Sequence, residues 1–387
     1  MNILLYSRRF FPDIGGIESV SLTLAEQIVA AGHSCTVVTE TSAPETLPGW
    51  SFSVERAPNR RRRMRLVQWA DVVHSNGASL AFFPYAALLR KPFIWTHQGY
   101  QLVSVDGLGW ADGKPAPLTP LASLRFHYPS LGLRTTVKET LKLALRRAVG
   151  FSAAKNVAIT RWVAQRQPLP RQVVIYNPFS LSRFRVVASM RGSARYDFLF
   201  VGRLVTEKGV DTLLRALAAL NARTGRTPAS LLIVGDGPHR TALEGTVQLL
   251  GLGPHVRFAG KMVGRELVDA IPDGKIAIVP SEWEEAMGGV ALELMAAGRP
   301  IIVSERGGLA ECISDGGWTF PNGDHAALAD LMATLLDDES VRYSKTAEAL
   351  RVLKHFDETA LAHQYLNVYS EVCGLPIDVQ SVRRAGG

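Results

Sequence analysis

The segment "PSEWEEAMGGVALELMAAGRP" (residues 280–300) places carboxylates and glycines together where a predicted strand gives way to a predicted helix. Glu285 and Glu293 have seven residues between them, with Gly288 and Gly289 in the gap. A carboxylate only accepts hydrogen bonds, so two of them beside glycine N–H groups can hold neighbouring hydroxyls while the backbone binds phosphate. Alternatively, a carboxylate at this place only complements the positive end of the helix dipole.

The segment "FLFVGRLVTEKGVDTLL" (residues 198–214) carries two cations between a predicted strand and a predicted helix. Arg203, which follows Gly202, offers a planar fork of donors, and Lys208 offers a point charge. Together they suit a diphosphate. The next predicted strand, in "LLIVGDGPHR", ends at Gly235. The alternative interpretation is a surface loop with solvated cations, followed by a turn that only caps the sheet.

A third glycine-rich turn lies near the start of the chain, in "SRRFFPDIGGIESV" (residues 7–20). Gly15 and Gly16 open a predicted helix, whose free N–H groups and partial positive charge can hold phosphate. A tight turn without a ligand is the alternative. The dinucleotide-binding fingerprint is absent, since it needs a third glycine and an acidic residue about 20 positions later.

Short apolar runs rich in β-branched residues alternate with helix-period segments, once before about residue 190 and once after it. Runs of this kind are typical of parallel strands covered by helices, so we expect an α/β protein with two doubly wound, Rossmann-like domains. The irregular, basic stretch 177–197 is the predicted linker. We predict domains at 1–185 and 186–365, and a segment 366–387 that packs back on the first domain and ends in a frayed tail. The carboxyl ends of both sheets should face a central cleft.

The totals agree with two domains, because 387 residues are too many for one ordinary core. The chain lacks an apolar run of about 18 residues and a signal-peptide pattern, and its three cysteines have no metal-type spacing. We therefore expect a reduced, cytoplasmic protein. Residues 1–190 carry 23 Lys+Arg against 10 Asp+Glu, whereas residues 191–387 carry 20 against 25. This asymmetry predicts that the first half meets an anionic partner: a membrane surface, nucleic acid or a phosphorylated substrate.

Two features carry the positive charge of the first half. One is "NRRRRMR", with five arginines in residues 60–65. The other is residues 133–150, where an apolar stripe and a basic stripe run side by side if the segment is helical. The apolar stripe is Val137, Leu141, Leu145 and Val149, and the basic stripe is Arg134, Lys138, Lys142 and Arg146. Such a helix can lie on anionic lipid, or it can pack its apolar stripe on the sheet and leave its cations in water. Nucleic acid is not expected, because no recognised binding motif is present.

Taken in order, "PDIGGIE", "VGRLVTEKGVDTLLRALAAL", "LLIVGDGPHR", "VRFAGKM" and "PSEWEEAMGGVALELMAAGRPIIVSERGGLAECI" resemble retaining glycosyltransferase family 4, whose fold is GT-B. The resemblance covers nearly the whole chain and is strongest from about 198 to 325. It implies transfer of a sugar, with retention, from a nucleotide-sugar such as a UDP-sugar to a hydroxyl acceptor. We expect a lipid-linked or anionic glycan acceptor, a role in cell-envelope glycan, lipopolysaccharide or exopolysaccharide synthesis, and peripheral contact with the inner face of the cytoplasmic membrane.

The resemblance also implies roles for individual residues. Glu285 would contact the donor sugar and Glu293 the ribose, while Arg203 and Lys208 would hold the diphosphate as it leaves. Gly16 would approach the same phosphates, and His97, in "WTHQG", would lie near the anomeric centre. His97 could instead be only a hydrogen-bonded structural residue. The donor site would be completed by Gly15, Gly202, Gly235, Lys261, Met262, Ala286, Met287, Gly288 and Gly289. The family works without a bound metal, and this chain has no Asp-x-Asp motif.

Two segments depart from the family pattern and leave the donor sugar open. Glu285-Ala286-Met287-Gly288 has methionine where the family has an aromatic residue, and Asn177-Pro178 replaces its usual N-G-V-D. A GT-B sugar-nucleotide epimerase is the alternative enzyme, and a non-catalytic sugar-nucleotide-binding protein is the alternative outside catalysis. The four charged residues Glu285, Glu293, Arg203 and Lys208 argue against the latter, because a pure binding protein does not need all of them.

Overall fold

The computed structural model describes residues 1–13, 15–43, 49–111, 113–188, 194–223, 225 and 227–376. By their contacts, the residues form two compact units. The first comprises Met1–Gly109, Ala116–Ser180 and Phe356–Gly387, and the second comprises Trp110–Pro115 and Leu181–His355. Among the described residues, no helix combines the length and the apolar character that crossing a bilayer requires.

The first unit is built on a parallel sheet with the strand order β3-β2-β1-β4-β5-β8-β9 in its described part. The strands are β1 (Asn2–Tyr6), β2 (Ser34–Thr39), β3 (Ser53–Arg56), β4 (Val72–Asn76), β5 (Phe93–His97), β8 (Lys155–Ala158) and β9 (Gln172–Val174). The helices of this unit are α1 (Gly16–Ala30), α2 (Arg60–Trp69), α3 (Phe83–Leu88), α4 (Pro120–Ser152), α5 (Arg161–Arg166) and α15 (Glu358–Cys373).

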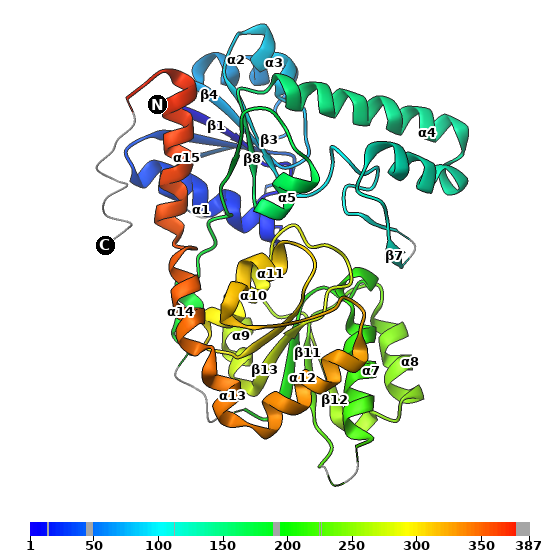
Figure 1. Ribbon diagram of the computed structural model, residues 1–387. Helices are drawn as coiled ribbons and strands as arrows, with labels where there is room; N and C mark the ends of the chain where they lie inside the picture. Colours follow the sequence, from blue (N-terminus) through cyan, green and yellow to red (C-terminus); the bar gives the residue numbers. More distant parts are fainter. Residues whose placement is uncertain are drawn as a thin grey trace. The chain divides into compact units, whose positions relative to one another are not determined.

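Both faces of this sheet are covered, which explains why its central strands β1, β4 and β5 are buried at nearly every position. In β1, Ile3 and Leu5 point to a core shared with α1 and α15, and Leu4 and Tyr6 point to a second core shared with α2, α3 and the end of α4. Figure 1 shows the helices on either side of the strands. The alternation follows from the two-residue period of a strand.

The first unit includes the end of the described chain. Helix α15 packs beside α1, and its residues Leu361, Tyr365 and Tyr369 are buried in the same core as Ile3. The Tyr369 hydroxyl is hydrogen-bonded to Nδ1 of His74 at 2.8 Å. Because His74 lies on β4, this bond joins the middle of the first sheet to the C-terminal helix.

Helix α4 bends at Gly132, where φ is 69°, and extends away from the first sheet (Figure 1). Only its last turns reach the core, where Val149 is buried. Val137, Leu141 and Leu145 are exposed. The predicted helix over 133–150 is therefore confirmed, but the alternative in which its apolar stripe packs on the sheet is wrong for these three residues. They lie on an exposed side of the helix, whereas Leu143, on another side, is buried.

The second unit has a six-stranded parallel sheet in its described part, with the order β12-β11-β10-β13-β14-β15. Its strands are β10 (Tyr196–Val201), β11 (Leu231–Val234), β12 (Val256–Gly260), β13 (Gly274–Val279), β14 (Ile301–Ser304) and β15 (Trp318–Phe320). Its helices are α6 (Ser182–Arg185), α7 (Val210–Asn221), α8 (Arg240–Leu249), α9 (Gly264–Ala270), α10 (Gly289–Ala296), α11 (Gly308–Ile313), α12 (His325–Asp337), α13 (Glu339–Ser344) and α14 (Thr346–Lys354). The short hairpin β6 (Trp110–Ala111) and β7 (Lys114–Pro115) groups with this unit.

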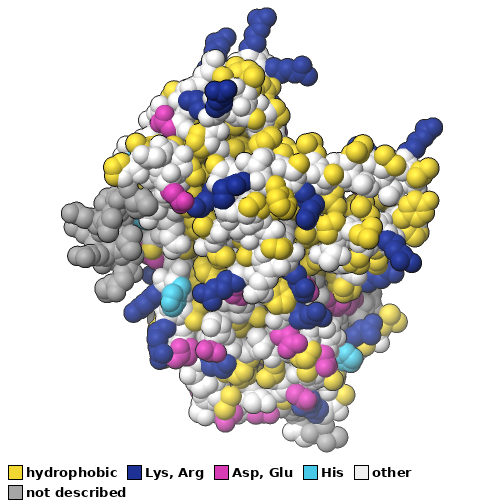
Figure 2. All heavy atoms as spheres, turned by 45° about the horizontal axis from the view of Figure 1, so that its top comes forward, with side chains coloured by type: hydrophobic (Ala, Val, Ile, Leu, Met, Phe, Trp, Pro, Cys, Tyr) yellow, Lys and Arg dark blue, Asp and Glu magenta, His cyan; other side chains and the backbone are white. Residues whose placement is uncertain are grey.

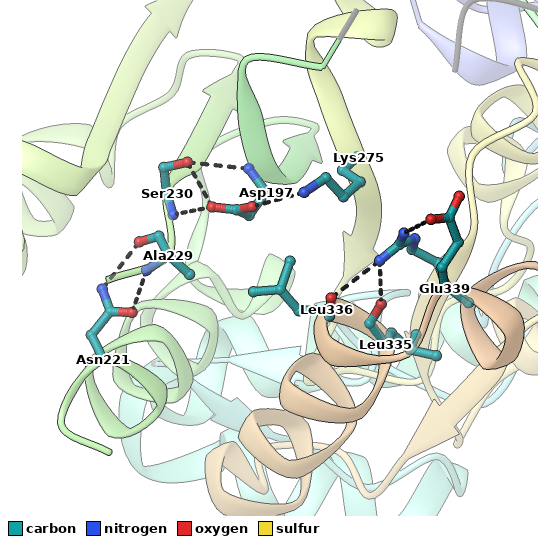
Figure 3. A network of polar contacts seen from close by, with 9 residues as sticks. Asp197, Asn221, Ala229, Ser230, Lys275, Leu335, Leu336 and Glu339 are labelled. Atoms are coloured by element: carbon teal, nitrogen blue, oxygen red, sulfur yellow. Dashed lines mark hydrogen bonds and ion pairs between the residues drawn. The ribbon is translucent and has the colours of Figure 1, made fainter. Parts of the chain in front are cut away.

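A polar cluster holds the amino ends of the central strands together in the second unit (Figure 3). The Asp197 carboxylate, at the start of β10, accepts hydrogen bonds from the backbone N–H and hydroxyl of Ser230, at 2.9 and 3.0 Å. It also pairs with Lys275 of β13 at 3.2 Å. Since these groups stand at strand starts, the opposite, carboxyl edge of the sheet remains for the predicted site residues.

The predicted fold class is confirmed: the chain is an α/β protein with two doubly wound, Rossmann-like halves. In each sheet the first strand of the half lies in the interior, with later strands added on both sides. This order creates the switch point beside which parallel α/β sheets commonly bind ligands. The predicted linker contains the short helix α6, and its residues 189–193 lie outside the described part of the chain.

Candidate functional site

Lys208 and Glu285 meet at the carboxyl edge of the second sheet. Each follows a strand, β10 or β13, and these two strands are neighbours in the sheet. The Lys208 ammonium donates a hydrogen bond to Oε1 of Glu285 at 2.8 Å. The Ser281 hydroxyl donates to the same oxygen, and the Lys208 nitrogen lies 5.7 Å from the centre of the Trp283 ring. The chain therefore places a cation and a largely buried carboxylate in contact here.

A glycine makes this approach of the two loops feasible. The 3₁₀ turn Thr206–Lys208 ends at Gly209, whose φ of 66° is left-handed. A Cβ at Gly209 would stand 2.0 Å from the carbonyl oxygen of Pro280, so any larger residue would push the loops apart. The backbone N–H of Glu282 donates to the carbonyl of Glu207 at 3.0 Å, which joins the loops directly.

The loop that carries Glu285 is also held by the neighbouring strand exit. The Gly308 N–H donates to the Glu285 carbonyl at 2.6 Å, and a Cβ at Gly307 would stand 2.7 Å from the Glu285 nitrogen. The Asn322 amide donates to the carbonyl of Ser281 at 3.1 Å. Sequence reasoning missed Ser281 and Asn322. The position of Ser281 at a strand end was a signal for it, but no local pattern points to Asn322.

Glu293 lies on α10 and is held by a residue of the predicted linker. Its carboxylate lies 3.5 Å from the guanidinium of Arg183, on α6. Burial raises the pKa of Glu293 to about 7, and the charge of Arg183 opposes that rise. Arg183 was missed as a site residue because nothing in the local sequence shows that α6 packs beside α10.

The segment between the two carboxylates forms the start of α10. Gly288 precedes the helix, and Gly289 is its first residue. A Cβ at Gly288 would stand 2.5 Å from Leu309, so this glycine permits close packing against α11. Ala286 is buried and Met287 is half-buried. The backbone of this segment is packed tightly. The N-terminus of α10, with its free backbone N–H groups, follows Glu285 closely in the chain.

The other second-unit candidates lie on neighbouring strand exits. Gly235 follows β11 with φ of 149°, and its Cβ would stand 1.8 Å from the carbonyl oxygen of Gly202. Arg203 is 72% exposed, and its guanidinium lies 4.0 Å from the Glu207 carboxylate. Gly235 thus lets the loop after β11 lie against the loop that begins at Gly202, whereas the Arg203 side chain is exposed to solvent.

Lys261 and Met262 directly follow β12. Lys261 is exposed and Met262 is half-buried. The carbonyl of Gly260, just before them, accepts a hydrogen bond from the Gly235 N–H at 2.8 Å. This bond places the start of their loop beside the exit of β11.

Gly15 and Gly16 belong to the first unit and start α1. The backbone of Gly15 is extended, and a Cβ on it would stand 2.4 Å from a carboxylate oxygen of Glu18. A Cβ on Gly16 would meet no atom of the described structure within 4 Å. The helix N-terminus is therefore open beside Gly16 and carries an acidic group beside Gly15.

His97 ends β5 in the first unit and is only 1% exposed. Its Nε2 is hydrogen-bonded to Oδ1 of Asn156 at 3.0 Å, and its Nδ1 has no partner among the described residues. Burial lowers the pKa of His97 to about 4, and the bond to Asn156 opposes that effect. His97 is thus a hydrogen-bonded, neutral imidazole with one ring nitrogen unused.

Next to His97, amide side chains from three strand exits form a connected cluster. Gln98 donates to the side-chain oxygens of Asn76 and Asn177 at 2.7 and 2.9 Å, and Asn177 returns a bond to Gln98 at 2.8 Å. The Asn76 amide donates to the Ser21 hydroxyl at 2.8 Å. Asn177 is the first residue of the segment in which the sequence departs from the family's N-G-V-D. The asparagine is retained and joins this cluster, and the departure begins at Pro178.

Two family profiles match the chain. Residues 195–338 match glycosyl transferases group 1, and residues 14–183 match glycosyltransferase family 4. The chain is 34% identical over 194 residues to a D-inositol 3-phosphate glycosyltransferase of Corynebacterium efficiens, a match that spans 49% of this chain and 46% of that protein. It is 27% identical over 384 residues to a phosphatidyl-myo-inositol mannosyltransferase of Mycolicibacterium smegmatis, covering 95% of this chain and 92% of the relative.

Solved structures of other proteins share the fold. Sucrose-phosphate synthase from Thermosynechococcus elongatus aligns with a TM-score of 0.71 and 22% identity, over 96% of this chain and 99% of that one. HepE from Anabaena, in complex with UDP, aligns with a TM-score of 0.69 and 17% identity, over 96% of this chain and all of that one (100%).

Proposed function

Since the chain belongs to glycosyltransferase family 4 and has both Rossmann-like halves of the GT-B fold, we propose that it transfers a sugar from a nucleotide-sugar donor to a hydroxyl acceptor. The observation that carries this proposal is the contact between Lys208 and Glu285. It places a cation suited to a diphosphate beside a carboxylate suited to sugar hydroxyls, at the edge of the sheet where ligands of this fold class bind.

In this proposal each charged group has one task. Arg203 and Lys208 stabilise the negative charge that develops on the departing diphosphate, and an electrostatic contribution of this kind often dominates catalysis. Glu285 accepts hydrogen bonds from the sugar, and Glu293 from the ribose. A UDP-sugar donor is supported by the Anabaena structural relative, which binds UDP. We expect the anomeric configuration to be retained, because the enzymes of this family retain it.

The first experiment is a thermal-shift screen of the purified chain against nucleoside diphosphates and sugar nucleotides. A ligand that binds only the folded state raises the melting temperature by mass action. We expect the nucleoside diphosphate and sugar nucleotides of one base to raise the melting temperature of the wild-type protein. The same ligands should not raise the melting temperature of Lys208→Ala. The proposal is contradicted if no sugar nucleotide stabilises the protein, or if Lys208→Ala responds as the wild type does.

Transfer itself is tested by incubating the selected donor with candidate acceptors and determining the anomeric configuration of the product by NMR. Transfer with retention supports the proposal, and an inverted product contradicts it. An acceptor-free reaction separates the alternatives, since an epimerase makes product without any acceptor. Tight donor binding with neither hydrolysis nor transfer would identify a non-catalytic binding protein.

We propose that this transfer needs no metal ion, because Arg203 and Lys208 supply positive charge where the diphosphate leaves. The test is the rate of transfer after exhaustive treatment with EDTA and after addition of Mg²⁺ or Mn²⁺. The rate should stay within about two-fold in all three conditions, since cationic side chains rather than a metal provide the stabilisation. A rate that collapses with EDTA and returns with metal contradicts the proposal.

The acceptor is proposed to be lipid-linked or anionic, and the exposed face of α4 supports this. Leu133, Val137, Leu141 and Leu145 are exposed along one side of the helix, with Arg134, Lys138 and Lys142 on the adjoining side. Figure 2 shows hydrophobic and basic side chains with few acidic ones over the first unit. A second copy of this face would bring cations against cations, whereas an anionic lipid surface matches both the charge and the apolar stripe.

The arginine run of residues 60–65 contributes less positive charge to a membrane contact than its number of arginines suggests. Arg62 and Arg63, on α2, pair with Glu55 and Glu40. Arg60, Arg61 and Arg65 are exposed. We therefore propose that α4 makes the main contact and that the protein works at the inner face of the cytoplasmic membrane in envelope glycan, lipopolysaccharide or exopolysaccharide synthesis.

This surface is tested by flotation with vesicles of phosphatidylcholine, with and without phosphatidylglycerol. The wild type should float only with the anionic vesicles, and the double variant Leu141→Ser/Leu145→Ser should lose at least about ten-fold in affinity, because it removes apolar area from the contact. Leu249→Ser is the matched control, since Leu249 is 89% exposed on α8 of the other unit. Equal binding to neutral vesicles, or self-association through α4 without lipid, would contradict the membrane proposal.

A further inference from the structure

The buried amide of Asn156 has a defined orientation. Its Nδ2 donates to the carbonyl oxygens of Gly150 and Pro170, at 2.7 and 2.9 Å. If the amide were flipped, its oxygen would face two carbonyl oxygens, and none of the three atoms could donate a hydrogen bond. The nitrogen must therefore face these carbonyls, and Oδ1 must face His97.

This orientation decides which nitrogen of His97 carries the proton. Oδ1 of Asn156 only accepts, so Nε2 of His97 must donate at their separation of 3.0 Å. A neutral imidazole has one N–H, and Nδ1 therefore keeps its lone pair. The imidazole is neutral because His97 is buried, with its ring 4.8 Å from that of Trp95. The nearest charge along β8, on Lys155, is paired with Glu371 at 2.5 Å.

The lone pair on Nδ1 is the unexplained feature. It is buried and has no partner among the described residues. A buried polar atom without a hydrogen bond is energetically unfavourable, so such atoms are rare away from functional sites. His97 stands at the carboxyl end of β5, where ligands of parallel α/β sheets bind.

We infer that Asn156 is a positioning residue that fixes the tautomer of His97, so that Nδ1 accepts a hydrogen bond from a substrate hydroxyl. Asn156 lies within β8 and is completely buried. Asparagine is a poor strand residue, and the strand interior gives it no advantage. Its three hydrogen bonds, one to His97 and two to the backbone, are the reason for its presence. The role toward substrate rests on the proposed sugar transfer, whereas the tautomer does not.

The tautomer is tested on the full-length protein labelled with ¹⁵N-histidine. In the wild type, the His97 signals should show a protonated Nε2 and an unprotonated Nδ1, with their assignment given by the signals that disappear in His97→Asn. In Asn156→Ser, the shifts should move toward a mixture of tautomers. A proton on Nδ1 in the wild type would overturn the inference without any assay of activity.

The role toward substrate is tested by a double-mutant cycle. Asn156→Ser should lower kcat/KM about ten-fold or more in the wild-type background and less than about two-fold in His97→Asn, where no imidazole remains to be oriented. His97→Asn, which keeps a polar group near Nδ1, should retain more activity than His97→Gln, whose amide replaces Nε2. Equal losses from Asn156→Ser in both backgrounds would overturn the positioning role. If the wild type transfers no sugar while the NMR result holds, the proposed function fails and the tautomer assignment stands.

Discussion

At the scale of single residues, two carboxylates of the second unit are each matched by a cation from a distant part of the chain. Glu285 is paired with Lys208, and Glu293 with Arg183. The two pairs differ in geometry: the first is a direct hydrogen bond of 2.8 Å, and the second is a looser contact of 3.5 Å.

Replacing Lys208 should therefore affect catalysis more than folding. We expect Lys208→Ala to lower kcat about 100-fold, because it removes a cation that stabilises the leaving diphosphate, while the melting temperature falls by only a few degrees. Steady-state kinetics and thermal unfolding measure the two effects. Lys275→Ala is the control, since Lys275 makes a similar ion pair with Asp197 at the opposite edge of the sheet. Parallel losses of activity and stability in Lys208→Ala would contradict this role.

Glu293 should make stability depend on pH. Its pKa rises from the model-peptide value of 4.5 to about 7 on folding because the carboxyl is buried. Between these values the folded protein keeps a proton that the unfolded chain has lost, so stability falls as the pH rises. Glu293→Gln cannot ionise and should be more stable than the wild type above pH 7, by roughly 1–3 kcal/mol, with little difference near pH 4.5.

Urea unfolding at about pH 5 and about pH 8 measures this difference. Glu339→Gln provides the control, because the Glu339 carboxylate on α13 is largely exposed. The explanation fails if Glu293→Gln changes stability equally at both pH values. For the same reason, nucleotide affinity should increase from pH 6 to pH 8 if ribose hydroxyls donate to the ionised carboxylate.

At the scale of elements, the candidate site is a set of strand exits packed against one another. Gly209, Gly235 and Gly307 each have a positive φ, and each lies where a Cβ would collide with the backbone of a neighbouring loop. Glycine at these places serves the packing of the loops, whether or not a phosphate also binds there. The assignment of Gly235 to the donor site thus has a sufficient structural alternative.

Gly235→Ala should accordingly destabilise the protein. Its φ of 149° and the 1.8 Å approach of its Cβ to the Gly202 oxygen predict a loss of roughly 2–4 kcal/mol in the free energy of unfolding. Gly245→Ala is the matched control, since Gly245 lies within α8 with open space around it. That change should stabilise the protein by about 0.5–1 kcal/mol. Similar effects of both substitutions would disprove the packing argument.

For the molecule as a whole, the notable feature is that the last helix, α15, belongs to the first unit although the second unit precedes it in the chain. Helix α15 fills the core beside α1 with Leu361, Tyr365 and Tyr369. One core of the first unit is therefore completed by residues that are translated only after the whole second unit. One consequence is that a substitution in α15 should weaken the first unit selectively.

Tyr369→Phe tests this consequence. It removes the hydroxyl bonded to His74 and leaves a buried ring nitrogen without a partner, at a cost of about 1–3 kcal/mol. Hydrogen exchange should accelerate in peptides from β1 and β4 and remain unchanged in peptides from β10 and β13. Tyr128→Phe, at an exposed tyrosine of α4, is the control. Faster exchange in both sheets alike would show that the return of the chain does not act on the first unit alone.

Much of this architecture was accessible from the sequence. The β-branched runs predicted parallel strands covered on both faces. The alternation of Ile3 and Leu5 with Leu4 and Tyr6 shows why these four residues of β1 are all apolar, since they supply two different cores. Lys208 and Glu285 were recognised because each follows a strand. The apolar stripe of α4 was ambiguous, since periodicity marks a stripe and does not show what covers it.

The succession of strands and helices and the type of side chain at each strand exit follow from the sequence, because both depend on residues close together along the chain. The partner of each of these side chains depends on the fold. Lys208 meets Glu285 because β10 lies beside β13, and Asn156 orients His97 because β8 lies beside β5. These neighbours are set by long-range strand pairing, which local spacing does not encode.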